Sequence, residues 1–379
     1  MKNTINGRYY KYIHLLWSNE LKFNGPVVKL INKLENNLKP EEHAFITRHE
    51  QVYKALKDYG NVFLDDNNKN LFNTYADSCN WLISHGYPEK QIVLMIKKKA
   101  KRKIVYRYWG GRRNPKKMIK GQPIRNLVRR GINSAYNYFF RKTYEDLPLI
   151  GIANIVDTID LRKLLKNTPL MRMPYIGEGR QDALLKTKQK HTRSDGYLHV
   201  LIGHRSEPSE HHIYYLELLR KFEYEKIKIF IPLSYGDAEY AESVKNYVKE
   251  ENLENVTIVD EFMDYSKYVE FLNDMDIGLI DCDNSLALGN IGILLRLGKT
   301  LYISRNGVIK EAFDLEKVPY HCLDEIKNMD FSQFSKLLTI DENSSEEFKS
   351  HGYEYHIDRW RDIFAFLDDK LDMQKHIVD

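Results

Sequence analysis

Cysteine is scarce in this chain of 379 residues, which contains only Cys79, Cys282 and Cys322. Three thiols are odd in number, and these are widely separated along the chain. The pattern therefore favours neither a disulfide framework nor a zinc site. It fits a protein of a reducing cytoplasm.

Long apolar runs are also missing. The N-terminal residues MKNTINGRYYKY hold no apolar segment of the kind that a signal peptide needs. The longest apolar stretch, Leu147–Val156, is broken by Pro148, Gly151 and Asn154, and it is too short to span a bilayer. With 42% hydrophobic and 29% charged residues, the chain is long enough for two globular domains. We expect a cytoplasmic location.

Acidic residues are absent from Lys97 to Arg130, where fifteen Lys or Arg occur. Such a block is either a solvated basic face or a surface for an anionic partner: nucleic acid, an anionic membrane leaflet or a pyrophosphate-bearing substrate. Interleaved aromatic residues such as Trp109 favour the membrane surface, at the inner face of the cell membrane. No stacking platform or helix-turn-helix pattern supports nucleic acid. The predicted membrane- or acceptor-binding residues are Lys98, Lys99, Lys101, Arg102, Arg112, Arg113, Lys116 and Lys117.

The stretch Tyr197–Leu301 alternates short apolar runs with segments of helical spacing. A run of strand length ends at Gly203, and an apolar series spaced for a helix follows. This is half of a doubly wound nucleotide-binding protein, whose ligand should lie at the carboxyl ends of the strands. Later elements are predicted at Ile227–Pro232, Ala238–Glu251, Val256–Val259, Ile277–Ile280 and Thr300–Ser304.

The first half has the same character. Strands are predicted at Tyr10–Leu16 and Trp81–Ser84, a helix at Pro26–Leu38, and a polar linker at Gly177–Gly196. A 3-4 spacing that includes Trp360 predicts an amphipathic helix near the end of the chain. We expect an acceptor-binding domain at 1–176, with helix 345–379 packing back on it, and a nucleotide-sugar donor-binding domain at 177–344. The predicted fold class is α/β of the GT-B type, with two Rossmann-like doubly wound domains facing across a cleft.

Several motifs carry a family resemblance. The chain resembles the bacterial TDP-N-acetylfucosamine:lipid II N-acetylfucosaminyltransferases, more strongly in its second half than in its first. The second-half residues are Val200–Gly203, Ser206, Pro208, Ser209, His212, Ile213, Ile231–Gly236, Tyr268, Leu272, Asp276–Gly278, Gly289, Asn290, Arg305 and Asn306. Those of the first half are His14, Ser18, Asn24, His85, Gly86, Trp109, Gly110 and Pro174.

The resemblance implies an inverting, hexosyltransferase-type bacterial enzyme. It would move a deoxy-amino sugar or a related sugar from a TDP- or UDP-sugar to a lipid-linked or surface polysaccharide acceptor in cell-envelope glycan synthesis. The chain departs from the family's pattern at Asn284–Ala287, His204, Arg205 and Arg112. Two alternatives stay open: a polyol-phosphate-type phosphotransferase, for which His204, His211 and His212 would be suited, and a non-catalytic binding module.

Glycosyl transfer makes specific demands on the donor site. The leaving nucleoside diphosphate develops negative charge, which backbone amides, helix N-termini and cations stabilise. Tyr235 could stack on the base or sugar, and Glu311 could accept hydrogen bonds from donor hydroxyls. The predicted donor-binding residues are Gly203, Arg205, Ser206, Tyr235, Gly289, Asn290, Arg305 and Glu311.

An inverting transfer also needs a base for the acceptor hydroxyl. Glu20 and His85 follow predicted strands of the first domain and are the candidates. Asp281 and Asp283 form an Asp-X-Asp pair of the kind that holds a divalent metal in other glycosyltransferases. Because this pair closes a strand of the predicted donor domain, where protein groups would hold the diphosphate, we predict no metal and no cofactor besides the donor.

Overall fold

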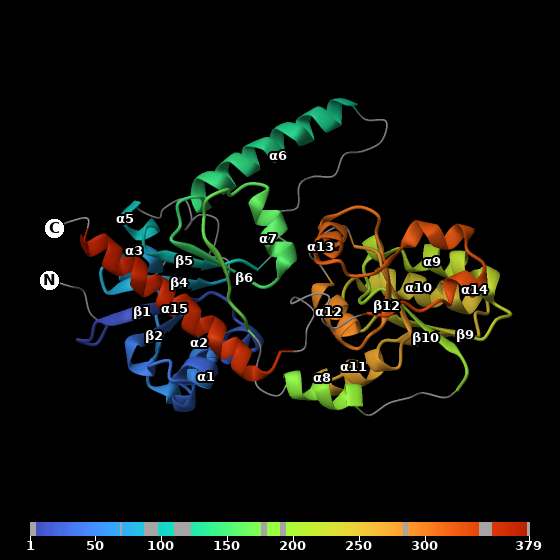
Figure 1. Cartoon of the computed structure of the whole chain (residues 1–379), viewed down its shortest axis with the longest axis horizontal. Coiled ribbons are helices and arrows are strands. Elements are labelled where there is room, and N and C mark those ends of the chain that lie inside the picture. The colour runs from blue at the N-terminus through green and yellow to red at the C-terminus, as the bar shows by residue number, and fades with distance from the viewer. Residues whose placement is uncertain are drawn as a thin grey trace. The chain divides into compact units, whose positions relative to one another are not determined.

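The computed structural model covers the whole chain and describes residues 5–68, 70–86, 98–109, 123–175, 180–189, 195–282, 287–340 and 351–376. The chain divides into two compact units (Figure 1). Unit 1 combines Met1–Glu178 with Gly352–Asp379, and unit 2 is Gly179–His351. The boundaries predicted from the sequence, after 176 and before 345, lie close to these limits.

Unit 1 contains a seven-stranded, wholly parallel sheet in the order β3-β2-β1-β4-β5-β6-β7. Apolar runs of strand length form its two central strands, which are buried over most of their length, as expected for a sheet covered on both faces. All carboxyl ends of these strands lie at one edge. The strands are β1 Tyr10–Leu16, β2 His43–Thr47, β3 Val62–Leu64, β4 Cys79–His85, β5 Ile104–Arg107, β6 Leu149–Ile152 and β7 Leu170–Arg172.

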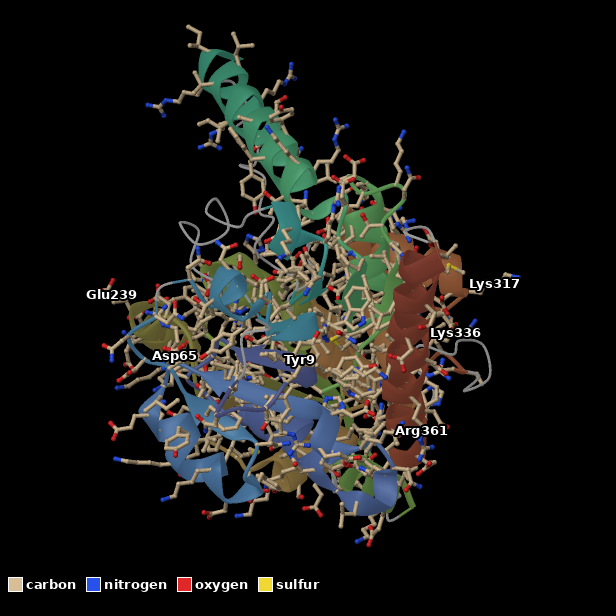
Figure 2. All side chains as sticks on the ribbon, turned by 90° about the vertical axis from the view of Figure 1, so that its left-hand side faces the viewer. Tyr9, Asp65, Glu239, Lys317, Lys336 and Arg361 are labelled. Carbon is tan, nitrogen blue, oxygen red and sulfur yellow. The ribbon has the colours of Figure 1, made fainter. Side chains whose placement is uncertain are left out.

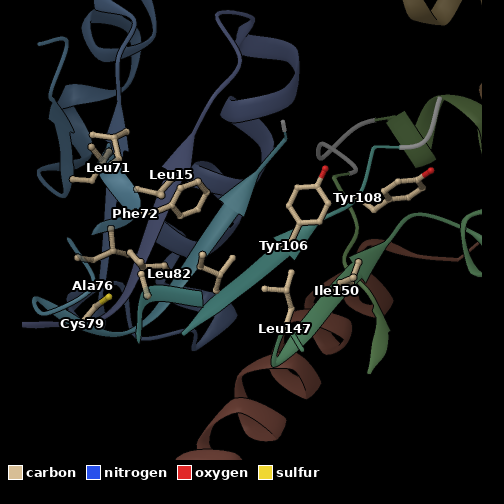
Figure 3. Close-up of a cluster of buried hydrophobic side chains, with 14 of the residues drawn as sticks. Leu15, Leu71, Phe72, Ala76, Cys79, Leu82, Tyr106, Tyr108, Leu147 and Ile150 are labelled. Atoms are coloured by element: carbon tan, nitrogen blue, oxygen red, sulfur yellow. The ribbon is translucent and has the colours of Figure 1, made fainter. Parts of the chain in front are cut away.

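Two apolar cores lie on the two faces of this sheet. One contains Leu15, Leu82, Tyr106 and Ile150, which Figure 3 shows together. The helices of unit 1 are α1 Leu21–Asn32, α2 Glu50–Leu56, α3 Leu71–Tyr75, α5 Lys98–Lys101, α6 Pro123–Tyr144, α7 Ile155–Arg162 and α15 Tyr353–His376.

Helix α15 completes the second core of unit 1. Trp360 is fully buried there, and its indole N–H donates to the carbonyl of Pro174 at 3.1 Å. The buried Phe364 packs on Tyr12 of β1, with ring centroids 4.7 Å apart. The spacing that predicted an amphipathic helix therefore corresponds to a helix whose apolar face lies on unit 1.

Unit 2 contains a six-stranded parallel sheet in the order β10-β9-β8-β11-β12-β13. Its strands are β8 Leu198–Ile202, β9 Ile227–Pro232, β10 Val256–Val259, β11 Ile277–Ile280, β12 Thr300–Ile303 and β13 His321–Cys322. Its helices are α8 Arg180–Gln189, α9 His212–Leu219, α10 Ala238–Glu250, α11 Tyr265–Asn273, α12 Leu288–Arg296, α13 Val308–Glu316 and α14 Phe331–Phe334.

Two predicted segments differ from the structure. The predicted linker Gly177–Gly196 contains α8, whose Leu184 is buried in the core of unit 2. The helix predicted at Pro26–Leu38 is α1, which begins at Leu21 and holds Pro26 in its interior. Both predictions gave too much weight to local composition: α8 is polar overall, and proline is most common in the first turn of a helix.

No helix in the part of the chain that the structure describes is long and apolar enough to cross a membrane.

Candidate active site

The turn that follows β8 in unit 2 strongly favours glycine. Gly203 has a φ of +69°, a conformation that costs L-residues strain. A Cβ atom at this position would collide with Oε2 of Glu210 and Nε2 of His212. The sequence therefore places the smallest residue where two functional side chains approach the backbone at the carboxyl edge of the sheet.

Glu210 is a buried acid that the sequence analysis missed. Its side chain is 5% exposed, and its Oε2 accepts a hydrogen bond of 2.7 Å from the backbone N–H of His204. Oε1 lies 2.6 Å from Nδ1 of His204 and 3.7 Å from Nε of Arg205. Glu210 thus holds two basic residues beside Gly203. Pro208 and Ser209 look like an ordinary helix start, so only the run of histidines around Glu210 could have signalled its position.

The ring of His212 directs an N–H donor toward the turn at Gly203. Its backbone N–H donates to the hydroxyl of Tyr240 at 3.1 Å, and that hydroxyl lies 3.3 Å from Nδ1 of the ring. Tyr240 therefore donates to Nδ1, which leaves the hydrogen on Nε2. Burial lowers the pKa of His212 to about 4, so the ring is neutral at pH 7. Within the described part of the chain, Nε2 has no hydrogen-bond partner.

The loops after β8 and β9 are joined at Ser206. Its backbone N–H and its hydroxyl each donate to the carbonyl of Tyr235 at 2.9 Å, and its own carbonyl accepts from Asp237 at 2.6 Å. Ser206 also forms a bridge to Gly236. The ring of Tyr235 is 54% exposed at this edge. The structure therefore brings Gly203, Ser206 and Tyr235 together.

Asn290 reaches the same group through Tyr268. Its side chain hydrogen-bonds to the Tyr268 hydroxyl, which interacts electrostatically with Tyr235 and Glu210. Burial raises the pKa of Tyr268, so this phenol is neutral. Gly289 precedes Asn290 in the first turn of α12, and a Cβ there would meet nothing within 4 Å. Because β8 and β11 are neighbours, both helix starts belong to one edge.

Arg305 and Glu311 lie further along that edge. Arg305 follows β12 and is bound to Asp324 at 2.8 Å and to Glu325 at 3.1 Å, which raises the pKa of its guanidinium. Glu311 lies in the first turn of α13. The interactions of the described residues connect Arg305 to these two acids and not to the turn at Gly203.

The Asp-X-Asp pair is only partly described. Asp281 accepts hydrogen bonds of 2.8 Å from Nδ1 of His211 and from the hydroxyl of Tyr215. Asp283 lies outside the described residues. Among the residues that the structure describes, no group of three or more His, Cys, Asp or Glu could hold a metal ion.

A chain of hydrogen-bonded imidazoles runs through unit 1. His85 ends β4, and its Nδ1 is bonded to the hydroxyl of Tyr175. Its Nε2 lies 2.8 Å from Nδ1 of His14, and Nε2 of His14 lies 2.9 Å from Nδ1 of His43. His43 completes the series with a hydrogen bond to the backbone of Leu38. A carbonyl can only accept, so each ring carries its hydrogen on Nε2 and the phenol donates to His85.

The imidazole chain is uncharged at neutral pH. All three rings are buried, and burial lowers the pKa of His85 and of His43 to about 3. It places the pKa of His14 well below its ordinary value. Both nitrogens of His85 are engaged, so the ring offers no free nitrogen to an acceptor hydroxyl. This geometry does not favour the hypothesis that His85 itself acts as the base.

Glu20 is at the same edge of unit 1, but on the surface. It caps the start of α1 after β1, and its backbone N–H donates to the Ser18 hydroxyl at 3.1 Å. The carboxylate is 48% exposed and lies 2.5 Å from Nζ of Lys22. Of the two predicted bases, Glu20 is the one with an accessible oxygen.

The predicted basic surface is described in part. Lys99 pairs with Asp77 at 2.7 Å, and Lys101 donates to the Lys142 carbonyl at 2.7 Å. Lys98 begins the short helix α5, and Arg102 directly follows it. Outside the described residues lie Arg112, Arg113, Lys116 and Lys117.

A family comparison decides the class of the protein. The profile of the 4-alpha-L-fucosyltransferase family, glycosyl transferase group 56, matches residues 163–368, which is more than half of the chain. The chain belongs to glycosyl transferase group 56. It is a glycosyltransferase, as the motifs of its second half predicted.

Solved structures share the fold of this group 56 chain. A glycosyltransferase from Rickettsia africae is 13% identical with a TM-score of 0.57, and the match covers 98% of this chain and 99% of that one. Anabaena Alr3699/HepE in complex with UDP is 11% identical with a TM-score of 0.58, over 95% and 100% of the two chains. Trehalose 6-phosphate synthase from Burkholderia multivorans is 9% identical with a TM-score of 0.57, over 97% and 100%. The predicted GT-B fold is confirmed.

Proposed function

We propose that this glycosyltransferase moves a deoxy-amino sugar or a related sugar from a nucleotide-sugar donor, a TDP- or UDP-sugar, to a lipid-linked or surface-glycan acceptor. The donor would bind to unit 2, and unit 1 would supply the acceptor site and the base. The observation that carries the proposal is the convergence of Gly203, Glu210, His212 and Tyr235 at one sheet edge. Anabaena HepE, which has the same fold, binds UDP in its crystal structure.

The chemistry of this edge suits a leaving nucleoside diphosphate. The Nε2–H of His212 and the guanidinium of Arg205 are donors, and both lie beside the turn at Gly203. Glu210 holds Arg205 and His204 in place and is itself buried. Stabilisation of the developing charge by positioned donors is the largest contribution that such a site makes to catalysis.

For the acceptor step we propose Glu20 as the general base of an inverting, metal-independent transfer. The accessible carboxylate of Glu20 and its place at the carboxyl edge of unit 1 support this role. A lipid-linked acceptor implies work at the inner face of the bacterial cell membrane, as a peripheral cytoplasmic enzyme of envelope glycan synthesis.

The test of the donor site is a pair of glycine substitutions. Gly203→Ala puts a methyl group into the space between Glu210 and His212, and Gly298→Ala is the matched control. Both glycines lie in unit 2 at similar φ, +69° and +74°, but a Cβ at Gly298 meets nothing within 4 Å. Both variants share the backbone strain, and only Gly203→Ala disturbs the site.

Binding of TDP-, UDP- and GDP-sugars to the full chain would be measured by thermal shift and calorimetry. We expect Gly203→Ala to weaken binding of the selected nucleotide sugar by about tenfold or more. The added methyl group would displace the side chains of Glu210 and His212, and the hydrogen bond from the Nε2–H of His212 to the charged diphosphate would be lost. Gly298→Ala should bind it like the unmodified chain. Equal affinities for the two variants would refute this donor site.

A further inference from the structure

Helix α6 is attached to unit 1 by its C-terminal turns. Phe140 is 7% exposed and belongs to the core that contains Tyr106, and Tyr144 stacks on Tyr106 with ring centroids 4.8 Å apart. The preceding turns project away from the rest of unit 1 in both Figure 1 and Figure 2. The helix therefore has one anchored end and one projecting end.

The exposed side of this helix is apolar. Its most exposed large apolar residues are separated by three, four, seven or eleven positions, which are spacings that place them on one face of a helix. We call this face the α6 stripe. Its members are Ile124 (80% exposed), Leu127 (70%), Val128 (59%), Ile132 (45%), Tyr138 (54%) and Phe139 (57%).

The opposite side of the helix is polar and half-buried. Asn126, Arg129, Asn133 and Asn137 share that face, and each is less exposed than the members of the α6 stripe. A surface helix of a globular protein has the reverse arrangement, with its apolar face on the core and its polar face in water. A contiguous apolar stripe of this kind marks a surface that meets an apolar partner.

Charge identifies the kind of partner. Helix α6 carries five cationic residues and no acidic residue. Two copies of such a helix would repel each other, so self-association through the stripe is disfavoured. An anionic lipid leaflet can bind both the apolar stripe and the cations. The apolar face would be buried at the boundary between headgroups and acyl chains, and the anionic headgroups would attract the flanking cations. The cations are Arg125, Arg129, Arg130, Arg141 and Lys142.

We propose that α6 lies in the plane of an anionic membrane leaflet, with the α6 stripe inserted at the headgroup–acyl boundary. This deepens the proposed function, since it names the surface at which a lipid-linked acceptor would be met. It also changes the expected character of binding. A basic block alone would bind by charge and be released by salt, whereas an inserted stripe keeps part of its affinity when the charges are screened.

The test uses the full chain and vesicles that are about one-third phosphatidylglycerol in phosphatidylcholine, with pure phosphatidylcholine vesicles as the neutral comparison. Co-flotation is measured at about 0.1 M and about 1 M salt, between which the Debye length falls from about 10 Å to about 3 Å. The unmodified protein should bind the anionic vesicles at low salt and retain measurable binding at high salt. It should bind the neutral vesicles more weakly.

Two variants locate the contact. Leu127→Gln with Val128→Gln removes the centre of the α6 stripe at exposed helical positions where glutamine is well tolerated. Leu34→Gln with Tyr224→Gln is the matched control, since these residues are 78% and 94% exposed and lie outside α6. We expect the first double variant to bind vesicles about tenfold more weakly or worse at both salt concentrations. The control double variant should bind like the unmodified chain.

Other outcomes would overturn the proposal. Vesicle binding by the Leu127→Gln/Val128→Gln variant at the unmodified level would exclude insertion of the stripe. Absence of vesicle binding by the unmodified chain, or a concentration-dependent dimer that this double variant abolishes, would assign the stripe to another partner. Nucleotide-sugar binding without vesicles is measured on the same samples and should be equal in all of them. Loss of donor binding in every sample would contradict the proposed function while leaving the membrane result intact.

Discussion

The two units contain buried histidines in opposite situations. In unit 1, every ring nitrogen of His14, His43 and His85 is hydrogen-bonded, either to another of these rings, to the Tyr175 hydroxyl or to the backbone of Leu38. In unit 2, Nε2 of His212 is buried beside Gly203 and has no hydrogen-bond partner among the described residues, while Oε2 of Glu210 lies 3.8 Å away. The same residue type thus joins neighbouring strands in the interior of unit 1 and offers an unused N–H donor in unit 2. Burial alone does not distinguish these roles, whereas counting the hydrogen bonds of each ring does.

Acid should affect unit 1 more than unit 2, and this is the largest effect we expect. Its three buried imidazoles have lowered pKa values, whereas the unfolded chain takes up their protons near pH 6.5. Stability is therefore complete above about pH 6.5 and falls as the pH drops toward about 3, by about 1.4 kcal/mol per pH unit for each ring. In unit 2, the pKa of His212 is about 4 and that of His321 is also lowered.

The natural tryptophans make the comparison measurable. All four, Trp17, Trp81, Trp109 and Trp360, belong to unit 1, so their fluorescence reports the unfolding of that unit. When urea unfolding is followed by fluorescence, the urea concentration at the midpoint should fall steadily as the pH drops below about 6.5. A midpoint that stays constant down to about pH 5 would contradict the picture of neutral, buried rings.

Breaking the imidazole chain at its centre should destabilise unit 1 strongly. His14→Phe leaves Nδ1 of His43 without a donor and Nε2–H of His85 without an acceptor, each costing about 1–3 kcal/mol. The dependence on acid should also weaken, because one titrating ring is gone. Tyr224→Phe is the control, since that residue is 94% exposed and its replacement should cost less than about 0.5 kcal/mol. Equal losses of unfolding free energy in the two variants would mean that the chain of hydrogen bonds does not stabilise unit 1.

Glu20→Gln tests whether the accessible carboxylate, rather than the closed histidine chain, serves catalysis in unit 1. Removing a general base should lower turnover by about 10²–10⁴-fold and leave donor affinity nearly unchanged. Glu35→Gln is matched to it, because Glu35 is also an exposed acid paired with a lysine two residues away, at 3.3 Å. Steady-state rates would be measured with the nucleotide sugar selected by the binding panel, with and without EDTA. Full activity of Glu20→Gln would remove it from the mechanism, and loss of activity in EDTA would reopen the case for a metal.

Arg205→Gln tests the open edge of unit 2 and should have the smallest effect. The guanidinium is 25% exposed, and its Nε has no hydrogen bond among the described residues. Loss of one charged donor should weaken nucleotide-sugar binding by about tenfold, with little change in stability. Arg220→Gln removes an exposed arginine that pairs with Glu251 at 2.8 Å, and it should leave affinity unchanged. Isothermal calorimetry measures the nucleotide-sugar affinity of both variants. Matching affinities would show that Arg205 does not touch the donor.

Strands were the most predictable part of the fold. Tyr10–Leu16 and Ile277–Ile280 have the predicted bounds because short apolar runs that end in polar residues have few alternatives in a parallel sheet. Helices were less predictable. The helical pattern of α6 was hidden within a basic block, and its apolar residues became informative only when the structure showed that they face outward.

The donor edge could be predicted as a set of loops but not as a set of contacts. Strand order brought Gly203 and Asn290 to neighbouring strands, as the alternation of elements implied. Glu210 directly precedes His211, whose backbone is left-handed at a φ of +52°, and no local sequence pattern predicts that conformation. The pairing of Arg305 with two acids is a contact over twenty residues of sequence that only the fold defines.

Helix α15 has a consequence for the order in which the protein forms. Ribosomes release a chain from its N-terminus, and domains fold as units once all their residues have emerged. Unit 1 needs Trp360 and Phe364 to fill its second core, so it cannot be completed until unit 2 has already left the ribosome. The N-terminal part of the protein is thus expected to fold last. During synthesis α1 and α2 cover that face of the sheet only in part, so some of its apolar surface stays exposed until α15 has emerged.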